Sequence, residues 1–339
     1  MIRTYKTGIT FIEKSNHKTR TEAEGFCEKF WLNIDGYDYL FKANIGKNIG
    51  DYGSYISYGE VFFSYLAERV GFSSVNSSFC IAQTDNEILD GCLVQSFIDK
   101  DVLEEIAVED VITNYLYQPN NLLGKNALDS KNYVYEQVFT SIEMMQKVLS
   151  SLEKEIKVDK ESYYRLYEMC LIDYLVVQTD RNAYNMKLLV KQDKNGERYL
   201  TLAPTYDNGY IFALNKDKEE IENINSIVKE DLSTGLPYNF LNKLSPLFNV
   251  SNYEDMNTHD YMNRLTHDLA LALTKSERLY NIFEKMSELN IREEIENFEN
   301  ITNYHLPNEY KEFIELAYNY RVKTLDQELN KVISENFTL

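Results

Sequence analysis

QTDRNAYN (residues 178–185) and APTYDNG (residues 203–209) are the two stretches of this sequence that decide the fold. Apolar residues recur at helical spacing before the first stretch and predict a helix over residues 160–179. Asp180 is therefore expected in the loop just past the end of a long, largely apolar helix.

A β-hairpin is expected between the two stretches. Its strands are predicted over residues 186–191 and 198–202, around Asn195-Gly196, which is the strongest short hairpin signal. Because a hairpin returns the chain to where it began, Asn185 and Asp207 are expected at the same end of the hairpin, close to Asp180.

Two carboxylates and one amide oxygen would then converge in one loop cluster, and hard oxygen ligands of this type suit Mg²⁺. Taken singly, Asp180 is also consistent with a helix cap or an ion pair with Arg181, while Asn185 and Asp207-Asn208-Gly209 are also consistent with plain turns. The order of helix, D-x-x-x-x-N, hairpin and Asp-x-Gly is far more specific. It is the order of the catalytic half of protein kinases, where one Asp handles the hydroxyl proton and an Asn and a second Asp hold metal.

A kinase also needs a lysine on an N-terminal strand. Lys42 lies near the end of a strand predicted over residues 37–43, after an Asp35-Gly36 turn, although an edge-strand lysine can also simply discourage aggregation. Glu60 lies in the first turn of a helix predicted to begin at Ser57. There it is either the acidic partner of the lysine or part of a capping box with Ser57.

Composition places the chain among soluble globular proteins, with 44% hydrophobic and 26% charged residues. We expect an α+β protein with a small β-rich lobe over residues 1–98 and a large, mostly α-helical lobe over residues 99–339. The net charge of −19 disfavours direct nucleic-acid binding. Four cysteines and four histidines lie far apart, which favours neither a zinc site nor a disulfide framework.

The sequence shows no apolar run of membrane-spanning length and no cleavable signal peptide, so neither membrane insertion nor a secretory leader is expected. The cytoplasm is the default location, and signal-independent export to a host cell is the alternative. The sequence indicates no oligomeric state.

The residues also carry a family resemblance. The chain resembles the HipA-like serine/threonine kinases of bacteria, and within them the short single-chain CtkA-like group. The matching pieces are EKFWL (28–32), YLFK (39–42), GE (59–60) with LAERVG (66–71), VQSF (94–97), TDRNAYN (179–185) and LAPTYDNG (202–209).

This resemblance implies a two-lobed protein-kinase-like fold that binds ATP and Mg²⁺ and phosphorylates serine or threonine in a protein. By position, Lys42, with Glu60 as its partner, would contact the α- and β-phosphates. The backbone of Gln95 and Phe97 would offer hinge contacts to adenine. Asp180 would act as base or orienter for the substrate hydroxyl, and Asn185 and Asp207 would hold the metal.

The sequence departs from the kinase pattern in several places. It has no G-x-G-x-x-G, and residues 15–28 form the candidate phosphate-covering loop, in which Ser15, Thr19 or Thr21 is a candidate for autophosphorylation. Asn182 stands where many relatives carry histidine. The extra N-terminal domain of full-length HipA toxins is not expected, because the lysine strand is reached by residue 42. The resemblance therefore gives little support for a role of this chain in a toxin–antitoxin pair.

Two further functions stay open beside the protein kinase. One is a kinase acting on a lipid or a small molecule. The other is a pseudokinase or nucleotide-sensing module, against which the joint presence of Lys42, Asp180, Asn185 and Asp207 argues.

Overall fold

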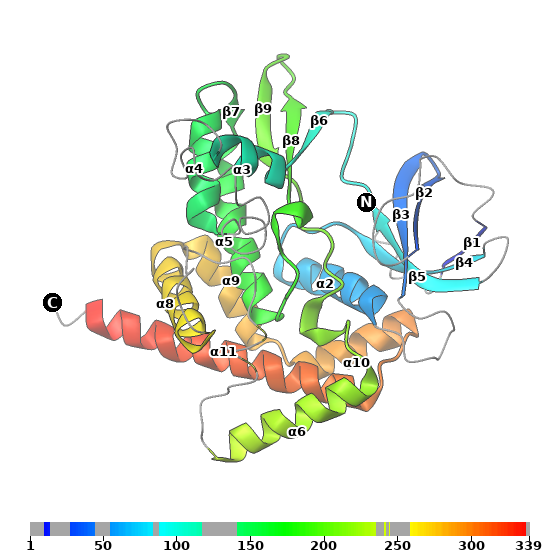
Figure 1. The fold of residues 1–339 in the computed structure, drawn as a ribbon, viewed down its shortest axis with the longest axis vertical. Coiled ribbons are helices and arrows are strands. Elements are labelled where there is room, and N and C mark those ends of the chain that lie inside the picture. Colours follow the sequence, from blue (N-terminus) through cyan, green and yellow to red (C-terminus); the bar gives the residue numbers. More distant parts are fainter. Residues whose placement is uncertain are drawn as a thin grey trace, which may run out of the picture. The chain divides into compact units, whose positions relative to one another are not determined.

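The computed structural model describes residues 10–13, 28–44, 55–83, 88–116, 141–234, 241, 244 and 258–336 of the 339-residue chain (Figure 1). By their internal contacts the residues form two compact units. Unit 1 comprises Met1–Phe97, Tyr206–Leu241 and Lys285–Tyr320, and unit 2 comprises Ile98–Thr205, Asn242–Glu284 and Arg321–Leu339. The first division falls between Phe97 and Ile98, and two later segments group with the N-terminal region. The lobes expected over residues 1–98 and 99–339 stay a prediction.

Unit 1 contains a five-stranded sheet in the order β1-β4-β5-β3-β2. Strand β1 runs parallel to β4, and the other neighbours pair antiparallel. The bounds are Thr10–Glu13 (β1), Lys29–Ile34 (β2), Tyr37–Ala43 (β3), Ser77–Gln83 (β4) and Ile88–Gln95 (β5). Asp35 and Gly36 join β2 to β3 with φ of 53° and 84°. This is the two-residue turn expected from the Asp-Gly pair, since both central residues of such a turn need positive φ.

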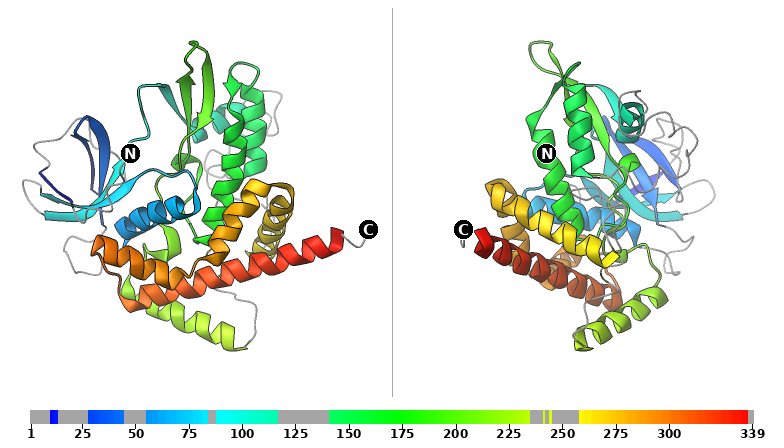
Figure 2. Two further views of the ribbon diagram at one scale, coloured as in Figure 1. Left: turned by 180° about the vertical axis from the view of Figure 1, so that it is seen from behind. Right: turned by 60° about the vertical axis from the view of Figure 1, so that its left-hand side comes forward.

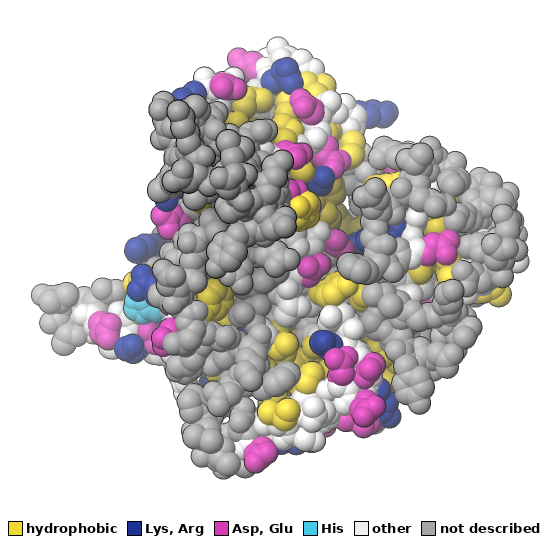
Figure 3. Space-filling view, viewed as in Figure 1, with side chains coloured by type: hydrophobic (Ala, Val, Ile, Leu, Met, Phe, Trp, Pro, Cys, Tyr) yellow, Lys and Arg dark blue, Asp and Glu magenta, His cyan; other side chains and the backbone are white. Residues whose placement is uncertain are grey.

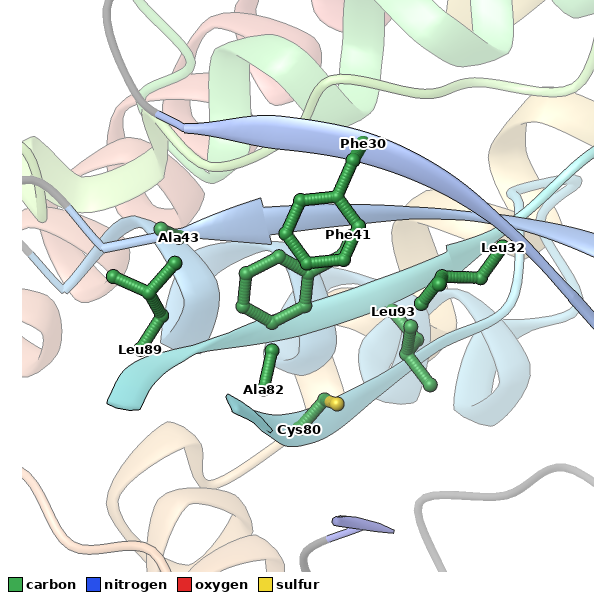
Figure 4. Close-up of a cluster of buried hydrophobic side chains, with 8 residues drawn as sticks. All are labelled: Phe30, Leu32, Phe41, Ala43, Cys80, Ala82, Leu89 and Leu93. Carbon is green, nitrogen blue, oxygen red and sulfur yellow. The ribbon is translucent and has the colours of Figure 1, made fainter. Parts of the chain in front are cut away.

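Alternating side chains of this sheet form a compact apolar cluster (Figure 4). The rings of Phe30 and Phe41 stack with centroids 4.7 Å apart, and both side chains are fully buried. The cluster comprises Phe30, Leu32, Phe41, Ala43, Cys80, Ala82, Leu89 and Leu93. Residues two apart on a strand share a face, so the alternation seen in β2 and β3 fixes which side of the sheet is apolar.

Helix α2 (Ile56–Val70) packs against β4 and β5 in unit 1 (Figure 1). Nearly all of its residues are buried, and Phe298 of α10 contacts the rings of Tyr58 and Phe62. Unit 1 also contains η4 (Ile211–Ala213), α6 (Lys218–Thr234), α10 (Ile291–Thr302), the end of α9 and the first part of α11.

Unit 2 contains a four-stranded sheet in the order β6-β8-β9-β7 and most of the remaining helices. The strands are β6 (Val102–Ala107), β7 (Lys157–Val158), β8 (Lys187–Gln192) and β9 (Arg198–Leu202). The helical segments are α3 (Val108–Leu116), α4 (Ile142–Leu152), α5 (Lys160–Leu175), η3 (Ala183–Asn185), α8 (Thr258–Lys275), the first part of α9 (Glu277–Glu288) and the last part of α11 (Asn308–Asn336). The hairpin of β8 and β9 lies beside α4 and α5 in both views of Figure 2.

The β8–β9 hairpin confirms the expectation from Asn195-Gly196, with a longer loop than a two-residue turn. Gln192 pairs with Arg198, and the carboxylate of Asp193 accepts the N–H groups of Asn195 and Glu197 across the loop. Gly196 supplies the positive φ of 85° that the loop needs. The helix expected over residues 160–179 ends four residues early, at Leu175.

Among the described residues, no helix is both long and apolar enough to cross a membrane. Acidic side chains are scattered among basic and hydrophobic ones on the face drawn in Figure 3.

Replacing Phe41 with Ala should destabilise the unit 1 sheet by about 3–5 kcal/mol, because it leaves a cavity against Phe30 in a closed cluster. Trp31 of β2 is the only tryptophan in the chain, so its fluorescence during urea unfolding reports on this sheet. Tyr37→Ala is the control, because Tyr37 lies on β3 like Phe41 but is 53% exposed. Its loss should cost less than about 0.5 kcal/mol. Equal losses would contradict the assigned core.

Candidate active site

Lys42 places a buried ammonium group between two carboxylates of unit 1. It is the second-last residue of β3 and is only 4% exposed. Its Nζ donates to Glu60 Oε1 at 2.5 Å and to Asp207 Oδ1 at 2.7 Å. Burial by itself lowers the pKa of the Lys42 ammonium, but the attraction of Glu60 and Asp207 outweighs burial and raises the pKa above its ordinary value. Lys42 is therefore held in its charged form.

Glu60 joins the lysine strand to the segment that carries Asp207. Its side chain is fully buried, and its second oxygen, Oε2, accepts the backbone N–H of Asn208 at 3.0 Å. Both carboxylate oxygens of Glu60 thus accept hydrogen bonds from residues far away along the chain. The capping box with Ser57 is wrong: the helix begins at Ile56, and among the described residues the Ser57 hydroxyl has no hydrogen-bond partner.

Two glycines allow the backbones of α2 and of residues 207–209 to touch. A Cβ on Gly59 would lie 2.5 Å from the carbonyl oxygen of Gly209, and a Cβ on Gly209 would lie 2.3 Å from the side chain of Ile56. Asp207 itself has φ of 56°, a left-handed conformation that costs a non-glycine residue about 1–3 kcal/mol. The packing around Glu60 therefore fixes both the position and the conformation of Asp207.

In unit 2, Asp180 and Asn185 form one hydrogen-bonded loop. The Asn185 amide nitrogen donates to the Asp180 backbone oxygen at 2.7 Å and to its carboxylate at 3.1 Å. Asn182 caps the short helix η3, since its side-chain oxygen accepts the N–H groups of Tyr184 and Asn185. Its amide nitrogen also donates to Asp180 Oδ1 at 3.3 Å. Asn182 thus orders the loop.

A buried ion pair holds this loop against α5. Arg181 is fully buried, and its guanidinium donates to both carboxylate oxygens of Asp173, at 3.0 and 3.3 Å. Burial raises the pKa of the Asp173 carboxyl, while the adjacent guanidinium lowers it in part. Sequence reasoning missed this pair. The signal was a single Asp inside an otherwise apolar run, which needs a buried partner.

The expected hinge residues lie at the end of β5 and just after it. The backbone N–H of Gln95 is donated to the Asn76 carbonyl at 2.8 Å. The Phe97 ring packs against that of Tyr206 with centroids 5.2 Å apart. Nothing in these contacts tests adenine binding, so the hinge roles stay predictions. The candidate phosphorylation sites Ser15, Thr19 and Thr21 lie outside the described residues.

The donor set fits a magnesium ion in type. In the part of the chain that the structure describes, no group of three or more His, Cys, Asp and Glu side chains could hold a metal ion. The expected ligands are the Asp207 carboxylate of unit 1 and the Asn185 amide of unit 2. Each offers an oxygen atom of the type that Mg²⁺ binds, and their joint role stays a prediction. Because the Asn185 amide nitrogen faces Asp180, its oxygen is the atom left to act as a ligand.

Comparison with known proteins shows what this fold resembles. No protein-family model and no curated protein matches the sequence. Among solved structures, the proinflammatory kinase CtkA of Helicobacter pylori matches with a TM-score of 0.59 and 15% identity, over 96% of this chain and 99% of that one. The chain resembles the HipA-like kinases in its fold.

A second solved structure supports the same resemblance. HipA of Shewanella oneidensis, in its toxin–antitoxin complex with HipB and operator DNA, matches with a TM-score of 0.50 and 11% identity, over 92% of this chain and 68% of that one. At such low identity the likeness shows the fold alone. The fold is α+β, with a small β-sheet region near the N-terminus and a helical C-terminal region.

Replacing Gly59 with Ala should destabilise unit 1 by about 1–3 kcal/mol, because the new methyl group meets backbone at Gly209. This sign is diagnostic, since the same change inside an unobstructed helix is normally stabilising. Ser57→Ala, two residues earlier, is the control and should cost less than about 0.5 kcal/mol, because its hydroxyl makes no hydrogen bond. Urea unfolding of both variants gives the comparison. A stabilising Gly59→Ala would contradict the close approach, and a loss of about 1 kcal/mol in Ser57→Ala would restore the capping box.

Proposed function

We propose that the chain is an ATP- and Mg²⁺-dependent serine/threonine protein kinase of the HipA-like type and that it phosphorylates itself. The observation that carries the proposal is the buried Lys42 ammonium held between Glu60 and Asp207. A lysine fixed by a fully buried glutamate keeps one defined position and a full charge, which is what a phosphate-binding lysine requires. A lysine that merely protected a sheet edge would have no need of two carboxylates.

In this proposal each residue has one task. Lys42 binds the α- and β-phosphates, with Glu60 holding it in place. Asp180 accepts a hydrogen bond from the substrate hydroxyl, orients it and takes its proton. Asn185 and Asp207 hold the metal, which when bound supplies positive charge to the phosphate oxygens. No covalent enzyme intermediate is needed, because positioning and charge neutralisation account for most of the rate of phosphoryl transfer.

The geometry of each loop supports these tasks separately. Asp180 and Asn185 are fixed to each other by two hydrogen bonds, and the loop is anchored through the buried Arg181–Asp173 pair. Asp207 is 28% exposed along its side chain, so it is the accessible member of the Lys42 group, while Glu60 is closed off. Nucleotide binding would replace the Lys42–Asp207 contact and leave Lys42–Glu60 intact.

Phosphate transfer from labelled ATP should fall by at least about 100-fold in Asp180→Ala and in Asp207→Ala, since each removes a group that acts on the reacting atoms. Asp326→Ala is the matched control, because it removes one aspartate from an exposed position on α11 and should leave transfer unchanged. Transfer undiminished in both site variants would defeat the proposal. Transfer to a lipid or small molecule but to no protein would replace the protein kinase by the second enzymatic function.

Nucleotide binding without phosphate transfer would favour a pseudokinase. A thermal melting experiment, read beside the transfer assay, distinguishes a pseudokinase from an active kinase. ATP at about 100 times its Kd should stabilise the folded chain by about 2.7 kcal/mol. We expect the rise in melting temperature to need Mg²⁺ and to vanish with EDTA, and to be lost in Lys42→Met. A shift of this kind together with no detectable phosphate transfer would convert the proposal into the nucleotide-sensing one.

A further inference from the structure

A polar network lies where the lysine strand ends. Asn44 follows β3 directly, two residues after Lys42. Its backbone N–H donates to the carbonyl oxygen of Asp90 at 2.9 Å, and its amide nitrogen donates to Asp90 Oδ2 at 2.7 Å. Asp90 lies on β5, the neighbouring strand. The end of β3 is therefore fixed to β5 by a backbone and a side-chain hydrogen bond.

The same Asn44 side chain reaches α2. Its amide oxygen, Oδ1, accepts the backbone N–H of Ser57 at 2.9 Å. The first N–H groups of a helix have no partner within it, and the N-cap residue of α2, Tyr55, supplies no side-chain cap. Asn44 provides this missing acceptor. One amide group thus fixes the end of the Lys42 strand relative to the first turn of the helix that carries Glu60.

Tyr304, in the connection between α10 and α11, forms a second side-chain hydrogen bond with Asp90. Its hydroxyl donates to Asp90 Oδ2 at 2.7 Å and accepts from the Asn44 amide nitrogen at 3.4 Å. Its ring stacks on Phe79 of β4, with centroids 4.1 Å apart and planes 4° from parallel. The ring is therefore fixed by stacking, and the hydroxyl is aimed at the atom that both donors share.

We propose that Tyr304 is a positioning residue for the Lys42–Glu60 pair and acts through Asp90 and Asn44. Its hydroxyl fixes the Asp90 carboxylate, which orients the Asn44 amide, which in turn sets the spacing between β3 and α2. All of these residues belong to unit 1, and so do Lys42 and Glu60. The consequence for catalysis rests on the proposed kinase function, while the positioning itself does not.

The test compares Tyr304→Phe with Tyr318→Phe in the full chain. Each change removes one hydroxyl that donates a hydrogen bond and keeps the ring. The Tyr304 hydroxyl is partly buried, and the buried Tyr318 hydroxyl donates to the Met286 carbonyl, outside the network. Both variants should therefore lose a similar amount of stability. Only Tyr304→Phe should raise the KM for ATP, by about 10-fold or more, as expected for the loss of a hydrogen bond to a charged group. A purely structural loss would lower the active fraction and leave KM unchanged.

Amide hydrogen exchange gives a readout that does not depend on activity. The Ser57–Glu60 amides should exchange faster in Tyr304→Phe and at the wild-type rate in Tyr318→Phe. If the two variants agree in KM and in exchange while the wild-type chain transfers phosphate, the positioning role is overturned and the kinase function stands. If the wild-type chain transfers no phosphate but exchange rises only in Tyr304→Phe, the kinase function fails and the positioning role stands.

Discussion

The ammonium of Lys42 is a full charge removed from water, and the rest of unit 1 is arranged so that this charge is compensated. An unpaired buried charge is costly, whereas two carboxylates and their own hydrogen bonds can offset its desolvation. Glu60 and Asp207 come from a helix and from a segment more than 140 residues later in the chain. These backbones can approach because Gly59 and Gly209 lack side chains where they touch. The strained φ of Asp207 is maintained by the same packing.

Local signals in the sequence predicted the elements well. The Asp-Gly and Asn-Gly pairs marked both hairpins, and the apolar spacing marked α2 and α5. The sequence could not decide whether Glu60 is the partner of Lys42 or part of a capping box, because Ser57-x-x-Glu60 matches the capping-box pattern completely. The choice depends on partners far away in sequence, Lys42 and the Asn208 N–H, and tertiary contacts overrode the local pattern. The early end of α5 was missed because no glycine or proline marks it.

The sequence did not predict which polar side chains far apart along the chain form hydrogen bonds or ion pairs with each other. Asp173 and Arg181 form a buried pair, and Tyr304 and Asn44 both donate to Asp90 Oδ2 although the three residues are spread over the chain. Periodicity reports which face of an element is buried and does not report which buried polar groups meet. The likeness of fold to CtkA is present at 15% identity. Apolar cores tolerate exchange of residues at constant volume, while a charged cluster needs particular side chains.

The central claim is that Lys42 is a phosphate-binding lysine held ready by Glu60 and Asp207. A crystal structure of the chain soaked with a non-hydrolysable ATP analogue and Mg²⁺ tests it most directly. We expect Lys42 Nζ to keep Glu60, to leave Asp207 Oδ1 and to contact an α- or β-phosphate oxygen, with Asp207 turned to the metal. Density for neither nucleotide nor metal beside Lys42, with the 2.7 Å contact to Asp207 unchanged, would contradict the claim.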